Sequence, residues 1–233
     1  SAQGINNTLA QKLKKVAVVE ELTGTKCGWC PRGHVAMHNL SEKYGDQFIG
    51  IAMHQFSKTD PMYITDYDLG LPGAPSAIVD RTTLGDPYYN MPAAVEAALA
   101  NYPEATVSVS GQYNADSTQV EATATVTSLV SGQYEVAYML VADGLTSKTS
   151  SWKQANYYSK TQGAFKSKSE LPEDLQYLWD EPTSYNQVYN DVLIASSYSA
   201  SKNHAEFDEF VENGVTTGNY TLTMPTKKAL LKV

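Results

Sequence analysis

The two cysteines of the chain are the residues whose type and spacing point most directly to chemistry. They are Cys27 and Cys30, with two residues between them. A pair at this spacing can cycle between a dithiol and a disulfide, or can supply two of the four ligands of a zinc ion. A zinc site would have to recruit histidines, and the chain has His34, His38, His54 and His204. Because His34 and His38 would crowd the ligands onto one helix and its entry turn, we expect redox chemistry and no metal.

Redox chemistry needs a stabilised thiolate, and the segments around the pair are arranged to supply one. The apolar run at residues 16–19 predicts a buried strand, and apolar residues recur at helical spacing from Arg32 to Tyr44. The pair is therefore expected at the N-terminus of a helix, where backbone N–H groups and the helix dipole stabilise a thiolate. Lys26 and Arg32 flank the pair and are expected to add positive potential.

Further elements extend this segment into an α/β domain. A second apolar run at residues 48–53 completes a strand, helix, strand unit. A turn at residues 73–76 then leads into a third strand at 77–80, and the alanine-rich stretch 91–102 predicts a closing helix. We expect an α/β domain over residues 16–103, preceded by a polar tether at residues 1–15.

The sequence pattern changes at Pro103. Beyond it, residues 106–110 and 120–126 alternate apolar and polar residues with a period of two, as antiparallel strands do. Further strands are expected at residues 134–141, 187–198 and 220–224. We expect an all-β, immunoglobulin-like sandwich over residues 104–233, cored separately from the first domain. An insertion at about 146–185 is rich in aromatic residues, which we expect to pack against the sandwich, with anchors for a partner as the alternative.

Composition narrows the choice of partners. The formal net charge is −8, with 17 Lys and Arg against 25 Asp and Glu, which argues against nucleic acid because phosphate recognition needs clustered cations. No stretch approaches the roughly 20 apolar residues of a membrane-spanning helix, so membrane attachment is expected only through a removed, lipid-anchored leader. The abundance of Ser, Thr, Asn and Tyr favours a location outside the cytoplasm.

These motifs resemble the thioredoxin superfamily. The resemblance rests on Cys27-Gly28-Trp29-Cys30-Pro31 behind a buried strand and on Ala74-Pro75 ahead of a later strand, and it covers residues 16–103. In addition, Thr23-Gly24, Pro31 and the trailing β domain are similar to the Omp-type outer-membrane lipoprotein family of Bacteroidetes. That narrower resemblance covers most of the chain. It implies a thioredoxin-like domain followed by a β-sandwich, in the periplasm or at the outer-membrane surface.

The resemblance implies a role for each matching residue. Cys27 is the attacking thiolate, and the more buried Cys30 resolves the mixed disulfide. Pro75 is a cis-proline facing the sulfurs, and it turns the backbone of Ala74 outward to pair with an extended substrate. Trp29 is expected to be an exposed platform for partner contact.

A buried acid is also implied. Glu21, six residues before Cys27, matches the acid that relays the proton of the resolving cysteine, and Glu20 is the alternative if the strand register differs. Lys26 departs from the family pattern, which often has Trp at that place. His34 and His38 are expected to be solvated residues of the helix.

Two functions of different classes remain after these steps. The first is an extracytoplasmic thiol-disulfide oxidoreductase that acts on protein thiols or disulfides and needs no cofactor. The alternative is a non-enzymatic cell-surface or scaffold lipoprotein whose β-sandwich binds a protein or glycan partner. Catalytic turnover that depends on Cys27 separates the two.

Overall fold

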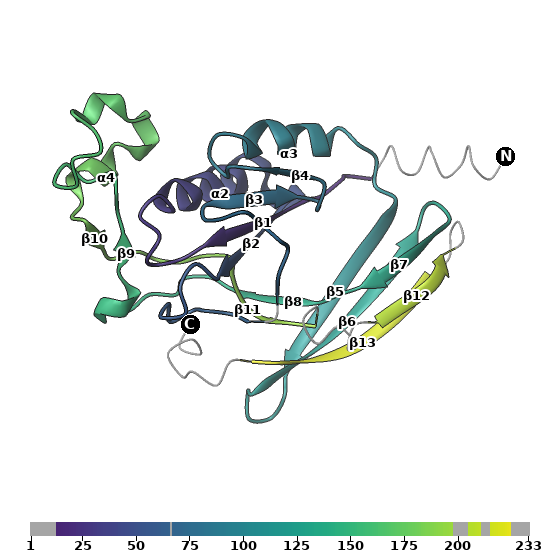
Figure 1. Ribbon diagram of the computed structural model, residues 1–233. Coiled ribbons are helices and arrows are strands. Elements are labelled where there is room, and N and C mark those ends of the chain that lie inside the picture. The colour runs from purple at the N-terminus through teal and green to yellow at the C-terminus, as the bar shows by residue number, and fades with distance from the viewer. Residues whose placement is uncertain (1–12, 66, 198–204, 211–214, 225–233) are drawn as a thin grey trace. The chain divides into compact units, whose positions relative to one another are not determined.

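The computed structural model describes residues 13–65, 67–197, 205–210 and 215–224 (Figure 1). The chain divides into two compact units, each assembled from segments that are distant in the sequence. We call Ala17–Ala98 with Val141–Leu193 the α/β unit, and the remaining segments the β unit, namely Ser1–Val16, Leu99–Leu140 and Ile194–Lys232. Most of the expected tether at residues 1–15, together with His204, lies outside the described residues.

A mixed six-stranded sheet contains both apolar runs found in the sequence. Its strand order is β4, β3, β1, β2, β11, β8, with β1 and β2 parallel and with β3 antiparallel to both β1 and β4. Branched aliphatic residues dominate these strands because they pack well on a pleated, buried surface. The strand bounds are β1 Ala17–Thr23, β2 Phe48–His54, β3 Ser76–Val79, β4 Thr83–Gly85, β8 Met139–Ala142 and β11 Val192–Ser196.

Helix α2, Pro31–Tyr44, begins directly after the second cysteine. Proline suits the first turn because that turn has no partner for its N–H group, and Ala36, Met37 and Leu40 form part of the buried face. Gly45, with φ of 55°, ends the helix, and the 3₁₀ turn η1, Gly45–Gln47, leads into β2. The second long helix is α3, Met91–Leu99. The prediction that the cysteine pair lies at a helix N-terminus is confirmed.

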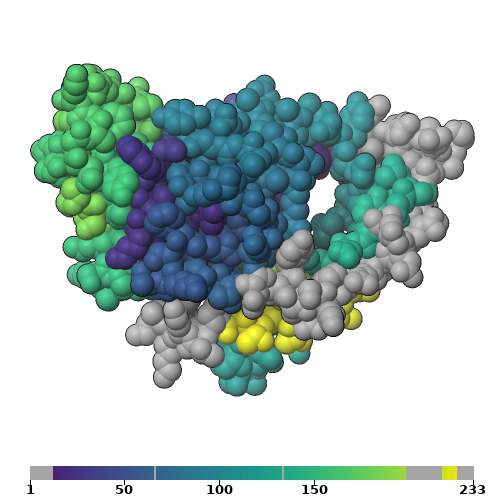
Figure 2. Space-filling view, viewed as in Figure 1, coloured from purple at the N-terminus to yellow at the C-terminus, as the bar shows by residue number. Residues whose placement is uncertain are grey.

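The aromatic insertion belongs to the α/β unit, which differs from the expected division of the chain. It consists of short elements, η2 Ser150–Trp152, β9 Gln154–Ala155, η3 Lys168–Glu170, η4 Glu173–Leu175, α4 Tyr177–Asp180 and β10 Ser184–Tyr185. They enclose a hydrophobic cluster of Tyr158, Leu171, Leu175, Leu178 and Tyr185. Trp29 and Val35 pack against this cluster, and Figure 2 shows the insertion, in green, directly against early residues in purple. The insertion therefore covers the cysteine region and not a sandwich.

Apart from the ends of β8 and β11, which belong to the six-stranded sheet, the strands of the β unit that the structure describes form antiparallel sheets. One sheet has three strands in the order β13, β6, β5, and the other pairs β12 with β7. Their bounds are β5 Ala105–Tyr113, β6 Gln119–Ser128, β7 Gly132–Val136, β12 Ala205–Phe210 and β13 Val215–Thr223. The buried cluster is formed by Ala122, Ala124, Tyr138 and Leu222, as the period of two predicts. The strand expected at residues 187–198 is found as β11, which instead pairs with β2.

The structure thus shows a mixed α/β chain with one large mixed sheet and additional antiparallel sheets. In the part of the chain that is described, no helix is both long and apolar enough to cross a bilayer.

Candidate active site

Cys27 and Cys30 form a disulfide in the turn between β1 and α2, with their Cα atoms 5.3 Å apart. The turn is closed by the N–H of Cys30, which donates to the carbonyl of Cys27 at 3.1 Å. Cys30 caps the helix, and the first turn of α2 carries no acidic residue that would offset the positive end of its dipole. This is the electrostatic setting in which a cysteine thiolate is stabilised.

Both cysteines are buried. Cys27 is 3% exposed and Cys30 is fully buried, so the expected order of burial holds, but neither side chain is open to solvent. Disulfide exchange requires a sulfur to be reached in line by an attacking thiolate. The residues that cover the pair therefore matter as much as the pair itself.

A short piece of the insertion lies along the cysteine loop, and we call residues 154–158 the cover segment. The N–H of Ala155 donates to the carbonyl of Thr25 at 2.7 Å, and the N–H of Tyr157 donates to the carbonyl of Gly28 at 2.9 Å. The ring of Tyr157 rests on Gly28, where a Cβ atom would come within 2.3 Å of it. The absence of a side chain at position 28 is what permits this contact.

Gln154 joins the cover segment to the loop through its side chain. Its amide nitrogen donates to the carbonyls of Cys27 at 2.9 Å and of Gly24 at 3.1 Å. Its amide oxygen lies 2.9 Å from Nε2 of His34, so His34 donates from that nitrogen. Burial lowers the pKa of His34 to about 4, and the ring is neutral at neutral pH. The expectation of a solvated residue holds for His38, which is exposed, whereas His34 is only partly exposed and hydrogen-bonds to Gln154.

Trp29 is packed, contrary to the expectation of an exposed platform. Its ring makes edge contacts with Tyr157, Tyr158 and Phe165 at centroid distances of 5.2, 5.3 and 6.2 Å. The hydroxyl of Tyr158 also donates to the carbonyl of Trp29 at 3.0 Å. Such contacts combine buried area with favourable ring geometry. The insertion thus encloses the side chain between the two cysteines.

Glu21 is the buried acid of the site. It is fully buried, and neither carboxyl oxygen has a hydrogen-bond partner among the described residues. A Cβ atom placed on Gly33 would lie 1.9 Å from Oε1 of Glu21, so this carboxyl sits against the first turn of α2, three residues after Cys30. Burial, with a further contribution from Asp191 and Asp86, raises the pKa of Glu21 to about 8.

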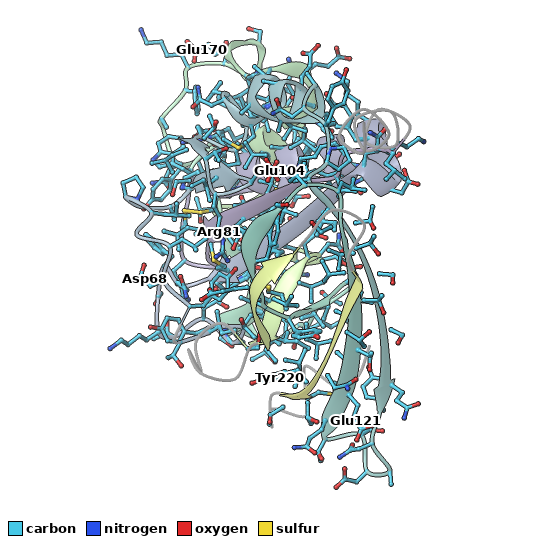
Figure 3. All side chains as sticks on the ribbon, turned by 90° about the vertical axis from the view of Figure 1, so that its right-hand side faces the viewer. Asp68, Arg81, Glu104, Glu121, Glu170 and Tyr220 are labelled. Atoms are coloured by element: carbon cyan, nitrogen blue, oxygen red, sulfur yellow. A yellow bond between two sulfur atoms is a disulfide. The ribbon has the colours of Figure 1, made fainter. Side chains whose placement is uncertain are left out.

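Glu20 has a different environment, which distinguishes the two glutamates. Arg81, labelled in Figure 3, donates to Oε1 of Glu20 at 2.9 Å, and the hydroxyl of Tyr67 also donates to this carboxylate. The carboxylate of Glu20 is therefore occupied by an ion pair and by a hydroxyl donor. Of the two candidates, Glu21 is the one whose carboxyl lies against the first turn of α2, and its role in proton exchange stays a prediction.

Glu21 also lines a cavity of about 700 Å³ within the α/β unit. Its other acidic side chains include Asp143, Asp174 and Asp191. Burial raises the pKa of Asp191 to about 6, with Asp143 adding to the shift. The cavity places polar groups beside the otherwise unpartnered carboxyl of Glu21.

The peptide bond between Ala74 and Pro75 is cis, as the resemblance implied. Pro75 is buried and leads directly into β3, whose Ser76 pairs with Leu22 near the end of β1. The cis-proline therefore enters the strand next to the one that leads to the cysteines. Its contact with the sulfurs and the substrate role of Ala74 stay predictions.

Asp60 and His54 form a buried pair that contacts the backbone just before the cysteine loop. No sequence pattern pointed to Asp60. Nδ1 of His54 lies 2.8 Å from Asp60, whose carboxylate also accepts the N–H of Thr25 at 2.8 Å. Although burial acts to raise it, these contacts hold the pKa of Asp60 below its ordinary value. The pair fixes the backbone two residues before Cys27.

The flanking cations contribute differently than expected. Arg32 forms an ion pair with Asp86 at 2.8 Å, which offsets its charge, whereas Lys26 is exposed. Arg32 also donates to the hydroxyl of Tyr158 at 3.2 Å. Arg32 therefore links helix α2 to Asp86 through an ion pair and to the insertion through Tyr158. No group of three or more His, Cys, Asp or Glu side chains among the described residues is arranged to hold a metal ion.

Two solved structures resemble the chain, and both resemblances are at low sequence identity. HBP35 of Porphyromonas gingivalis matches with a TM-score of 0.56 and 17% identity, covering 90% of this chain and 64% of that chain. Protein AGR_C_4864 from Agrobacterium tumefaciens matches with a TM-score of 0.46 and 14% identity, covering 91% of this chain and 80% of that one. No protein-family model matches the sequence, and no curated protein matches it. The chain thus spans 64% of the length of HBP35, and what it shares with that protein is the fold.

Proposed function

We propose that the chain is a thiol-disulfide oxidoreductase with a thioredoxin-like α/β unit, acting on protein thiols or disulfides. The observation that carries the proposal is the Cys27–Cys30 disulfide at the N-terminus of α2, with the carboxyl of Glu21 buried against the same helical turn. The cis bond before Pro75 and the fold shared with HBP35 support it. No cofactor enters the chemistry.

In the reductive direction, the reaction starts from the dithiol. The thiolate of Cys27 attacks a substrate disulfide, forming a mixed disulfide and releasing one substrate thiolate. Cys30 then gives its proton to the carboxylate of Glu21 and attacks the sulfur of Cys27. This step closes the Cys27–Cys30 disulfide and releases the second substrate thiolate, and the two released thiolates take up protons. The same steps in reverse oxidise a substrate dithiol.

The proposal also places the protein outside the cytoplasm, in the periplasm or at the outer-membrane surface. Disulfides persist in such compartments, and the composition is poor in Lys and Arg. HBP35, a Bacteroidetes protein, fits the narrower resemblance to the Omp-type lipoprotein family. Attachment through a lipid-anchored leader is part of the same proposal.

A non-enzymatic scaffold is the second candidate, and the burial of both cysteines favours it. In that case the disulfide only stabilises the loop, and the antiparallel sheets of the β unit carry the binding of a protein or glycan partner. The two functions predict different behaviour of the same pair.

Insulin reduction separates the two functions. The oxidoreductase is expected to catalyse reduction of insulin by dithiothreitol, and Cys27→Ser should remove this activity. Cys30→Ser should instead accumulate a mixed disulfide at Cys27, visible by mass spectrometry. A folded wild-type protein with no turnover, and with no mixed disulfide in Cys30→Ser, would exclude the enzyme and leave the scaffold.

A further inference from the structure

The cover segment is hydrogen-bonded both to the rest of the insertion and to the cysteine loop. On the insertion side, β9 pairs with β10 in an antiparallel ladder, and Asn156 bonds to the carbonyls of Thr183 and Leu178 through its backbone and its side-chain amide. On the loop side, Ala155 and Tyr157 donate their backbone N–H groups, and the side chains of Gln154 and Tyr158 donate to the carbonyls of Gly24, Cys27 and Trp29. The two sets of bonds are separate, so opening of the loop side breaks none of the bonds between β9 and β10.

The loop side of this contact has the features of a separable interface. The ring of Tyr157 is 39% exposed, although it rests on Gly28 and against Trp29. The side-chain amide of Gln154, in contrast, is fully buried. An approaching molecule thus meets Tyr157 before it meets either sulfur.

We propose that residues 154–158 form a gate over the redox pair, and that Gln154 and Tyr157 determine which molecules reach Cys27. In the closed state the gate occupies the loop carbonyls of Thr25, Cys27 and Gly28 and leaves the disulfide latent. A substrate gains access by displacing the gate, which moves with β10 as one hairpin. The selection of substrates by the gate rests on the proposed redox function. The opening of the gate is tested separately, by reduction of the disulfide and by hydrogen exchange.

Reduction of the disulfide by dithiothreitol reports the opening directly. One thiolate of dithiothreitol attacks a sulfur of the Cys27–Cys30 bond and forms a mixed disulfide, and its second thiol closes the oxidised ring. The protein pair leaves as a dithiol and takes up the protons that dithiothreitol loses. If the gate must open first, the observed rate scales with the open population.

Variants on both sides of the contact test the gate. Tyr157→Ala should speed reduction about tenfold, the effect of losing a well-packed aromatic contact, and Ala155→Pro about fivefold, because one N–H donor is lost. Gly28→Ala should also speed it about tenfold, since the new methyl group displaces the ring. The double variant Gly28→Ala with Tyr157→Ala should be reduced at the rate of the faster single variant, within about twofold, because both substitutions open the same contact. Tyr113→Ala, at an exposed ring of β5 in the β unit, is the control and should keep the wild-type rate.

Wild-type protein gives a second test that does not depend on a variant folding. Folding should slow hydrogen exchange at the amides of Ala155 and Tyr157 by a certain factor relative to unfolded protein. It should slow reduction of the disulfide by the same factor, within about threefold, because both reactions need the gate to open. The gate is overturned if the folded Tyr157→Ala and Ala155→Pro proteins reduce at the wild-type rate, or if exchange and reduction protections differ by orders of magnitude. If both gate tests succeed but the protein does not catalyse insulin reduction, the proposed oxidoreductase function is rejected and the gate proposal stands.

Discussion

Glu20 and Glu21 are adjacent residues with opposite environments, and strand geometry explains the difference. Successive side chains of β1 point to opposite faces of the sheet. Glu20 therefore meets Arg81 and Tyr67, whereas Glu21 lies against the first turn of α2. The residue types alone left both glutamates as candidates, because only the register of β1 decides which one faces the helix.

Glu21→Gln should make the protein more stable than wild type at alkaline pH. The folded protein holds the pKa of Glu21 at about 8, against an ordinary value of 4.5, so the wild-type protein loses stability as pH rises from about 5 through 8. The full loss is on the order of 5 kcal/mol at pH 9. Glutamine carries no charge and should remove this part of the pH dependence.

Urea unfolding of wild type and Glu21→Gln at pH 5, 7 and 9 measures this effect. Glu42→Gln, at an exposed helix position, is the control and should follow the wild-type curve. Parallel stability profiles for wild type and Glu21→Gln would mean that the carboxyl of Glu21 ionises in the folded state without cost.

Gln154→Glu should raise the pKa of His34. The substitution places a carboxylate at the amide oxygen that now lies 2.9 Å from Nε2 of His34, and an opposite charge at this distance raises a histidine pKa by roughly one to three units. NMR titration of the His34 ring checks this directly. Gln162→Glu, at an exposed position of the insertion, should leave the ring unchanged. An unshifted His34 would show that the two side chains do not share a hydrogen bond in solution.

At the scale of elements, the sequence correctly predicts the strands and helices that depend on the pattern of neighbouring residues. The strands β1 and β2 and the helix between them follow from apolar runs and helical spacing within about ten residues of each element, and the cis-proline was implied by the family resemblance. The insertion behaves differently. Its aromatic residues predicted a core, but periodicity contains no information about which surface that core would cover.

The cover segment shows why local sequence patterns do not predict the surface on which the insertion packs. Gln154 bonds to the carbonyl of Gly24 across a sequence separation of 130 residues. The segment is short, and its two strand residues in β9 have no distinctive alternation. Its place on the cysteine loop is set by three-dimensional packing, with Trp29 as the anchor. Asp60 was missed for the same reason, since its role depends on a backbone N–H at Thr25.

Trp29→Ala should loosen the insertion as a whole. Its ring packs against three aromatic rings of the insertion, and removing a partly buried tryptophan costs about 2 to 4 kcal/mol in such settings. Hydrogen exchange of amides in α4 and β10 should accelerate, and the free energy of unfolding should fall. Leu84→Ala, at a half-exposed position of β4, should cost under about 0.5 kcal/mol. Unchanged exchange in α4 would mean that the insertion core is stable without Trp29.

At the scale of the whole molecule, chain order and spatial units do not coincide. The chain leaves the α/β unit after Ala98, forms strands of the β unit, and returns at Val141 to complete the α/β unit. Sequence pattern marks the change of strand type near Pro103, but it cannot show that a later segment returns to the first core. We assumed from the sequence that each domain is one continuous stretch of the chain, and this assumption is wrong. It led us to expect the aromatic segment as an insertion in the β domain.

The return of the chain leads to a test of which pieces fold. A fragment ending at Glu104 contains all of β1, α2, β2 and α3, but it lacks the insertion that buries Trp29 and the strand β11 that pairs with β2. We expect it to be aggregation-prone or only partly helical by circular dichroism. A variant that joins Ala98 to Val141 through a flexible Gly-Ser linker of about 15 residues and ends at Ser196, the last residue of β11, restores both features. It should be soluble, show cooperative thermal unfolding, and protect its disulfide from dithiothreitol as the full chain does. If the fragment ending at Glu104 folds as cooperatively as the linked variant, the insertion is an accessory of the α/β unit and not part of its core.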